Sequence, residues 1–172
     1  MKNTKFIVIL AAVVMVGSLP MATQARAESM NFNLVSMYIK MERVKVTQME
    51  GVIVGVMDRM GLSIFDNGEI ATTSCRGTFD TKKGFQGYSS MVFEDGSTLV
   101  LAWKGPTSHS RPLGGKYRAY SMSVEYANGS GRFEGIKGTG TFTGKLPQWD
   151  EDYKNKGFGL YKFSGTYTLP SK

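Results

Sequence analysis

Residues 129–144 read GSGRFEGIKGTGTFTG, and this stretch decides how the rest of the chain is interpreted. Glycine inside a strand normally weakens it, so such a run indicates bulges, sharp bends or the close approach of another segment. A phosphate-binding glycine loop is the alternative, but that loop requires a helix directly after the glycines. Residues 139–143 instead continue as a strand, and no helical pattern follows. The stretch therefore predicts β-structure that bends sharply.

Short segments separated by turn signals extend upstream and downstream of this stretch. Asp95-Gly96 joins two β-prone runs, and this pair is a strong hairpin signal because both residues favour the turns that connect adjacent strands. Asp66-Asn67-Gly68 is a second turn signal, and Asn128-Gly129 is a third. Residues 58–61 are interpreted as a further turn. Strands are expected at residues 31–47, 51–57, 62–65, 70–79, 88–93, 98–103, 117–126, 131–144 and 158–169.

Alternation of apolar and polar residues predicts which side chains share a face of a strand. In residues 31–47 the apolar residues Val35, Met37, Ile39 and Met41 occupy alternate positions. About eight antiparallel strands in a chain of this length can close on themselves and leave no long exposed edge. The prediction is an all-β fold, a single eight-stranded antiparallel β-barrel over residues 28–172, with a two-sheet sandwich as the rival topology.

The motif Gly-x-Gly-Arg-Phe-x-Gly-x-x-Gly-x-Gly-x-Phe at residues 129–142, together with the turn at residues 93–97, resembles the allene oxide cyclase and dirigent-like barrels. The resemblance covers residues 87–169. It implies an eight-stranded barrel with an apolar interior that often assembles into dimers or trimers. Cyclase members isomerise a fatty-acid epoxide, and dirigent members steer the radical coupling of phenols. The glycine-arginine-phenylalanine motif is structural in these families, so the resemblance assigns no catalytic residue here.

The first 27 residues have the order of features typical of a secretory signal peptide. A positively charged start and an apolar run at residues 6–17 precede Pro20 and the small residues of 25–27. The apolar run is shorter than the ~20 residues that span a bilayer, which disfavours an uncleaved anchor. We expect cleavage between Ala27 and Glu28, no stable membrane anchor afterwards, and a periplasmic or secreted protein.

Composition after cleavage excludes several classes of function. The chain carries 21 Lys and Arg against 14 Asp and Glu, and loss of Lys2, Lys5 and Arg26 lowers the net charge from +7 to +4. The basic residues are spread along the chain, so nucleic-acid binding is not expected. Cys75 is the only cysteine, which excludes an intramolecular disulfide, and it is interpreted as a small buried side chain. One Cys and one His form no ligand set, so neither a metal site nor a cofactor is expected.

No catalytic constellation can be assigned from the sequence. His109, the only histidine, lies among small polar residues and is interpreted as an exposed loop side chain rather than a general base. The acidic residues 150–152 are interpreted as a solvated loop tip. Glu42 and Glu125 are the candidate inward carboxylates, which would need a cation such as Arg118 beside them, and solvent-facing positions are the alternative. Whether the protein is an enzyme stays open, with the balance against catalysis.

Aromatic and sulfur-containing side chains on the later strands are able to line a barrel interior that suits flat or lipid-like ligands, although ordinary core packing explains them equally well. The candidate pocket residues are Trp103, Arg118, Tyr120, Met122, Phe142, Tyr161 and Phe163. The sequence predicts an exported, non-catalytic barrel that binds a small apolar or aromatic molecule or a protein partner. The alternatives are an isomerase or cyclase that acts on a lipid-like substrate, and a subunit that assembles as a homodimer or homotrimer.

Overall fold

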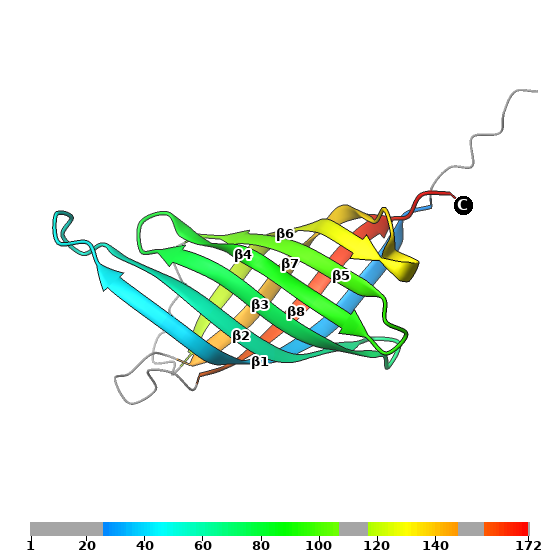
Figure 1. Cartoon of the computed structure of the whole chain (residues 1–172), viewed down its shortest axis with the longest axis horizontal. Helices are drawn as coiled ribbons and strands as arrows, with labels where there is room; N and C mark the ends of the chain where they lie inside the picture. The colour runs from blue at the N-terminus through cyan, green and yellow to red at the C-terminus, as the bar shows by residue number, and fades with distance from the viewer. Residues whose placement is uncertain (1–25, 107–116, 148–156, 172) are drawn as a thin grey trace, which may run out of the picture.

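The computed structural model describes residues 26–106, 117–147 and 157–171. Eight antiparallel strands form one closed barrel, in which neighbours pair in chain order and the last strand pairs with the first (Figure 1). The strands are β1 (Glu28–Lys45), β2 (Ile53–Phe65), β3 (Ile70–Asp80), β4 (Gly84–Phe93), β5 (Thr98–Gly105), β6 (Tyr117–Ser130), β7 (Lys137–Pro147) and β8 (Phe158–Thr168), and the 3₁₀ turn η1 (Gly131–Phe133) follows β6. The predicted all-β class and the eight-stranded closed barrel are confirmed. The predicted signal peptide lies, except for its last two residues, outside the described part of the chain.

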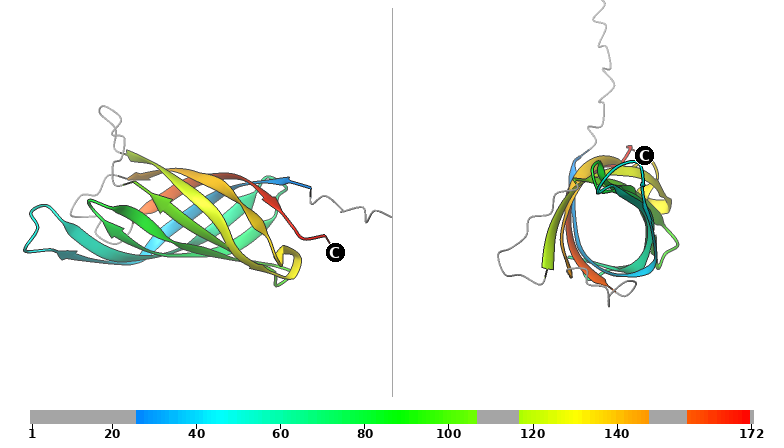
Figure 2. Two further views of the ribbon diagram at one scale, coloured as in Figure 1. Left: turned by 90° about the horizontal axis from the view of Figure 1, so that it is seen from above. Right: turned by 90° about the vertical axis from the view of Figure 1, so that its left-hand side faces the viewer.

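The two ends of the barrel carry different connections, as the side views in Figure 1 and in the left panel of Figure 2 show. We call one end the closed end, where the chain turns at residues 66–69, 94–97 and 131–136. We call the other the open end, where residues 46–52 connect β1 to β2 and residues 81–83 connect β3 to β4. No helix within the described residues is long and apolar enough to cross a membrane.

Phenylalanine rings fill the barrel toward the closed end. Phe32, Phe142 and Phe163 are almost fully buried, and their ring centroids lie 4.7 to 5.8 Å apart. Phe65 and Phe93 extend this phenylalanine cluster, with the Phe32–Phe65 centroids at 4.9 Å and the Phe65–Phe93 centroids at 5.3 Å. Each such ring pair contributes ~0.5–1.5 kcal/mol beyond the burial of its area. The closed half of the barrel is therefore a tightly packed apolar core.

Arg132, from the glycine-arginine-phenylalanine motif, covers this core at the closed end. Its guanidinium carbon lies 4.6 Å from the ring centroid of Phe93 and 4.8 Å from that of Phe133. The guanidinium donates to Asp95, at 3.2 Å, and to Glu69. Two aromatic rings and two carboxylates thus surround one partly exposed cation.

The glycine-rich stretch shapes this end in two ways. Gly131 has a φ of +62°, in the left-handed region that favours glycine, and it starts the η1 turn. Gly140 lies in β7 beside Phe163, and a Cβ at that position would lie 2.5 Å from the ring. The turn predicted at Asn128-Gly129 is displaced, because β6 continues to Ser130 and the chain turns only afterwards.

Residues 53–65 form the single strand β2 rather than two strands separated by a turn. The prediction of a turn at residues 58–61 is wrong because it rested on the adjacent polar residues Asp58 and Arg59. In the strand these two side chains point to opposite faces, as alternation requires. Arg59 is buried inside the barrel, whereas Asp58 lies on the outer side with Arg76 at 3.6 Å.

The apolar face expected from the alternation in β1 lies on the outside of the barrel. Val35, Met37 and Ile39 are exposed, and the side chains between them are buried. The β1–β2 register shifts next to Ile39, so that residue is an extra one in the strand. Such a bulge reverses the facing of the residues that follow, and Met41 accordingly packs against the core.

Candidate ligand-binding cavity

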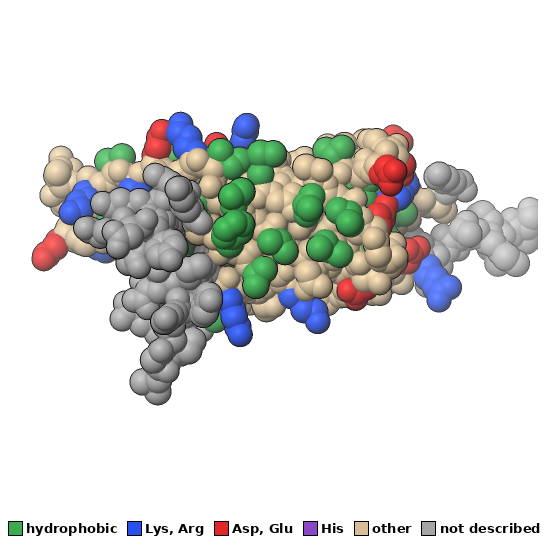
Figure 3. Space-filling model, turned by 90° about the horizontal axis from the view of Figure 1, so that it is seen from below, with side chains coloured by type: hydrophobic (Ala, Val, Ile, Leu, Met, Phe, Trp, Pro, Cys, Tyr) green, Lys and Arg blue, Asp and Glu red, His purple; other side chains and the backbone are tan. Residues whose placement is uncertain are grey.

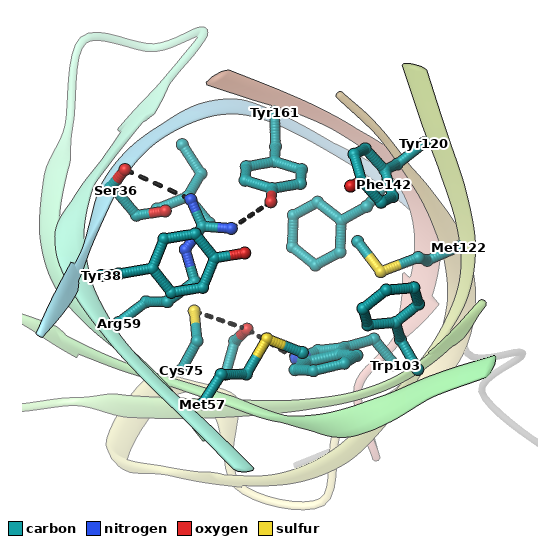
Figure 4. Close-up of a pocket in the computed structure, with 13 residues that line it drawn as sticks. Ser36, Tyr38, Met57, Arg59, Cys75, Trp103, Tyr120, Met122, Phe142 and Tyr161 are labelled. Carbon is teal, nitrogen blue, oxygen red and sulfur yellow. Dashed lines mark hydrogen bonds between the residues drawn. The ribbon is translucent and has the colours of Figure 1, made fainter. Parts of the chain in front are cut away.

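A cavity of about 50 Å³ lies inside the barrel, between the phenylalanine cluster and the open end (Figure 4). All eight strands contribute to its wall, because alternate residues of every strand point toward the barrel axis. The described lining residues are Leu34, Ser36, Tyr38, Met57, Arg59, Cys75, Phe85, Ser89, Trp103, Tyr120, Met122, Phe142 and Tyr161.

Arg59, on β2, is the one charged side chain among these lining residues, and it is only 6% exposed. Its Nη1 donates to the Tyr161 hydroxyl, and its Nη2 donates to the Ser36 carbonyl oxygen at 3.3 Å. The guanidinium carbon lies 4.3 Å from the ring centroid of Tyr38 and 4.8 Å from that of Tyr161. These residues meet because β1 pairs with both β2 and β8, although they are far apart in the sequence.

The two tyrosines beside Arg59 are neutral at physiological pH. Burial raises the pKa of Tyr161 and of Tyr38 above the ordinary value, and the nearby charge of Arg59 acts in the opposite direction on both. Arginine keeps its charge inside proteins. Burial acts to lower the pKa of Arg59, yet the pKa lies above its ordinary value because of Tyr161 and Tyr38. The described wall therefore carries a single positive charge.

Ser89, on β4, organises a second side of the cavity. Its Oγ accepts a hydrogen bond from Nε1 of Trp103 at 3.1 Å, and it lies 3.1 Å from Sγ of Cys75. Burial raises the pKa of the Cys75 thiol, although the bond to Ser89 acts the other way. The thiol is thus protonated and a weak nucleophile. The prediction that Cys75 is a small buried side chain is confirmed.

Two polar atoms of the cavity wall have no hydrogen-bond partner among the described residues. They are Nε of Arg59 and Oγ of Ser36. A buried donor that loses its water without gaining a partner costs ~1–3 kcal/mol, and more when the group is charged. Both residues line the same space, so both unused donors belong to groups that border the cavity (Figure 4).

The structure brings most of the sequence-predicted pocket residues together. Trp103, Tyr120, Met122, Phe142 and Tyr161 line the cavity. Phe163 lies in the phenylalanine cluster and is not one of the described lining residues. Arg118 belongs to β6, but its side chain is outside the described part of the molecule. That these residues bind a ligand stays a prediction.

The candidate inward carboxylates face the surface instead, so the prediction that they point into the barrel is wrong. Glu42 pairs with Lys40 at 2.8 Å, and the two side chains are 60% and 58% exposed. Glu125 is exposed between the buried residues Val124 and Tyr126, since strand alternation points it outward. Within the described residues no group of His, Cys, Asp and Glu could hold a metal ion. His109 and residues 150–152 lie outside those residues.

The sequence interpretation missed every lining residue on β1 to β4, and Arg59 is the charged one among them. Its position next to Asp58 and shortly before Gly61 suggested a turn. The alternation of side chains along the strand could have revealed Arg59. An unbroken strand over residues 53–65 places it on the same face as Met57 and Phe65. A charged residue among apolar residues on one face of a strand is a reason to expect a site.

Fold and site together define a closed eight-stranded antiparallel β-barrel with an internal cavity. The chain is similar to the solved pterocarpan synthase dirigent protein GePTS1, at 15% identity over 92% of this chain and 100% of that one, with a TM-score of 0.44. It is also similar to the pterocarpan synthase dirigent protein PsPTS1, at 14% identity over 86% and 97% of the two chains, with the same TM-score of 0.44. No family model and no curated protein matches the sequence. At such low identity the similarity concerns the barrel and assigns no residue or ligand.

Proposed function

We propose that the protein is an exported, non-catalytic barrel that binds a small apolar or aromatic molecule in its cavity. The observation that supports this most is the composition of the wall, where aromatic side chains surround a space beside a buried and incompletely hydrogen-bonded arginine. A side chain that served only packing would be apolar, because an unsatisfied buried polar group is costly. A few polar groups in an apolar pocket are typical of ligand sites, where they fix the orientation of the ligand.

The isomerase or cyclase alternative needs an inward carboxylate beside the cavity. None of the described lining residues is an Asp or a Glu, and Glu42 and Glu125 face the surface. Cys75, the cysteine of the wall, has a raised pKa and stays a protonated thiol. The described residues therefore favour binding over this chemistry.

Export is part of the proposal and rests on the signal-like residues 1–27. Cleavage after Ala27 would begin the mature chain at Glu28, which is also the first residue of β1. Such a cut would leave every strand of the barrel intact. The protein would then bind its ligand in the periplasm or in the extracellular medium.

Native mass spectrometry of the protein, purified from the periplasm of its own host, tests both parts. The proposal predicts a chain that begins at Glu28 and carries a small-molecule adduct, which denaturation releases. Absence of the protein from the periplasmic fraction would contradict export, and a mass that retains residues 1–27 would contradict cleavage after Ala27. A mature chain that carries no adduct would contradict an occupied cavity and shift the balance toward protein assembly.

A second role, assembly with another copy of the chain, is favoured by an apolar surface on β8, β1 and β2. This outer apolar face consists of side chains that are 38–60% exposed and lie on adjacent strands (Figure 3). Its members are Val35, Met37, Ile39, Met60, Leu62, Ile64, Phe158 and Leu160. Strand pairing places Leu160, Val35 and Leu62 in one row and Phe158, Met37 and Met60 in the next.

The size of the outer apolar face supports a second copy of the chain as its occupant. Eight large apolar side chains, each 38–60% exposed, lie together on three adjacent strands, whereas exposed apolar side chains that are scattered singly are normal on a monomer. A standard interface buries ~800 Å² on each partner. A symmetric dimer would cover the face with the same residues from its partner.

Sedimentation velocity tests this assembly. The proposal predicts a dimer or a larger assembly for the wild-type protein and a monomer for L62K/L160K, while T141K, at an exposed position of β7, keeps the assembly. A wild-type monomer at tens of micromolar would contradict the proposal, because the outer apolar face would then stay exposed to water.

A further inference from the structure

Arg59 lacks a negatively charged partner within the described residues. Every ion pair found there joins other side chains, and the groups that act on the pKa of Arg59 are Tyr161, Tyr38 and Cys75. Burial raises the pKa of each of these three, so none supplies a negative charge at neutral pH. A buried charge without a counter-charge is strongly unfavourable. The cation is therefore placed where a negative charge from elsewhere would be stabilised.

The ring contacts of Arg59 leave part of the guanidinium edge unused. Tyr38 and Tyr161 both lie within 5 Å of its carbon, which gives cation–π attraction but no neutralising charge. Along the edge, Nη1 donates to Tyr161 and Nη2 to the Ser36 carbonyl, while Nε has no partner among the described residues. Within the same part of the chain, Oγ of Ser36 has none either. The Tyr161 hydroxyl accepts a hydrogen bond from Arg59, so its own proton is left to donate a second hydrogen bond.

We propose that the cavity recognises the carboxylate of a small amphipathic acid, with Arg59 as its counter-charge and Ser36 and Tyr161 as further donors. This inference rests on the proposed binding function and names the class of ligand. The guanidinium edge matches the two oxygens of a carboxylate, and charge-assisted hydrogen bonds of this kind are about twice as strong as neutral ones. A single positive charge in the described wall suits a monoanion better than a phosphate dianion.

The opposite side of the cavity is apolar and accommodates the rest of the acid. Trp103, Met122 and Phe142 lie across the space from Arg59 (Figure 4). Ser89 fixes the indole of Trp103, so this wall presents a flat and pre-oriented surface. A resting volume of about 50 Å³ admits a group the size of a few water molecules, and flexible methionine side chains can move to enlarge it. As it stands, the cavity points to a short-chain carboxylic acid, and it admits a single-ring acid only once Met57 or Met122 moves aside.

Isothermal titration calorimetry on the exported protein, with trans-cinnamate and its neutral amide as probes, tests the inference. We expect cinnamate to bind at least about tenfold more tightly than cinnamamide, the ratio that a hydrogen-bonded charge provides. R59Q should abolish this preference, and R59K should retain part of it, since lysine keeps the charge but lacks the planar fork. R76Q is the matched control, because Arg76 is an exposed arginine on the adjacent strand β3, and it should bind like the wild type.

Three outcomes would overturn the proposal in distinguishable ways. Equal binding of both probes to the wild type, or an unchanged preference in R59Q, would remove the carboxylate assignment and leave the cavity as an apolar binding site. Binding of neither probe, nor of cinnamyl alcohol, would remove the proposed binding function as well. The variant D150N/E151Q/D152N tests the acidic residues of the chain itself. An affinity within about twofold of wild type supports an external acid, whereas a marked gain would show that an internal carboxylate competes for Arg59.

Discussion

Arg132 at the closed end and Arg59 in the cavity are both flanked by two aromatic rings, but they differ in their charged partners. Arg132 lies 4.6 and 4.8 Å from two ring centroids, and Arg59 lies 4.3 and 4.8 Å from two others. Arg132 is 39% exposed and bonds to two carboxylates, whereas Arg59 is 6% exposed and bonds to a phenol and a carbonyl. The more buried cation thus has the weaker partners. If both arginines served stability, the more buried one would be expected to have the stronger partners. We therefore interpret Arg132 as structural and Arg59 as functional.

The two halves of the barrel interior differ in the same way, one serving structure and the other the proposed function. The closed half contains closely packed phenylalanines, whereas the cavity half combines aromatic rings with serine, cysteine and arginine. Ring packing of the first kind stabilises the fold, since each buried ring removes a large apolar area from water. Buried polar groups of the second kind reduce stability and are retained at functional sites.

The largest effect on the free energy of unfolding is expected from a substitution in the closed half. Phe163→Ala should lower the free energy of unfolding by about 3–5 kcal/mol, because it removes a fully buried ring and leaves a cavity. Met122→Ala, at a half-buried position of the cavity wall, should cost less than half of this. Urea denaturation followed by circular dichroism measures both. Equal losses at the two positions would contradict the division of the interior.

An intermediate and asymmetric effect is expected when each arginine is replaced by methionine. R132M should cost about 1–2 kcal/mol, because two carboxylates and two ring faces lose their cation. R59M should change the free energy of unfolding by less than about 1 kcal/mol or increase it, since an apolar side chain replaces a buried charge that has no counter-charge among the described residues. Denaturation of both variants in the same buffer makes the comparison direct. A loss of about 3 kcal/mol or more in R59M would show that Arg59 is paired inside the chain.

The smallest effect on stability is expected from replacing Asp95, and this effect should depend on pH. A hydrogen bond from the Ser97 backbone, with help from the Ser97 hydroxyl and Arg132, holds the pKa of Asp95 below its ordinary value. The carboxylate therefore contributes stability above the ordinary pKa of an aspartate, and this contribution is lost as the pH falls through the lower folded value. D95N should be slightly less stable than wild type at pH 7, and the difference should vanish at low pH. Thermal denaturation between neutral and acidic pH measures it, and a constant difference would contradict the assignment.

The sequence allowed most of the fold to be predicted, because turns and alternation are local properties. The Asp95-Gly96 hairpin follows from residue types that permit only a few backbone conformations. The turn after β6 was predicted two residues too early, at Asn128-Gly129, and residues 131–136, expected as strand, belong to it. Which face of β1 points inward was not predictable in this way. Both faces carry apolar residues there, and alternation alone does not distinguish an interior from an outer apolar face.

The candidate site was predictable only in part. Its aromatic wall, including Trp103 and Tyr161, follows from the composition of the later strands, whereas Arg59 became recognisable only when β2 was seen as one strand. The contact between Arg59 and Tyr161 spans 102 residues and depends on barrel closure between β1 and β8. Such a contact is a property of the register of paired strands and is invisible to any local pattern.

The most direct test of the central claim is the ¹H–¹⁵N resonance of the Arg59 Nε–H group, followed by NMR during titration with trans-cinnamate. We expect a saturable shift of this resonance and slower exchange of its proton with water, because Nε gains a partner that it lacks among the described residues. The corresponding resonance of Arg132 should stay unchanged. Saturable binding of cinnamate that leaves the Arg59 resonance in place would contradict the claim that this buried arginine is the recognition group of the barrel.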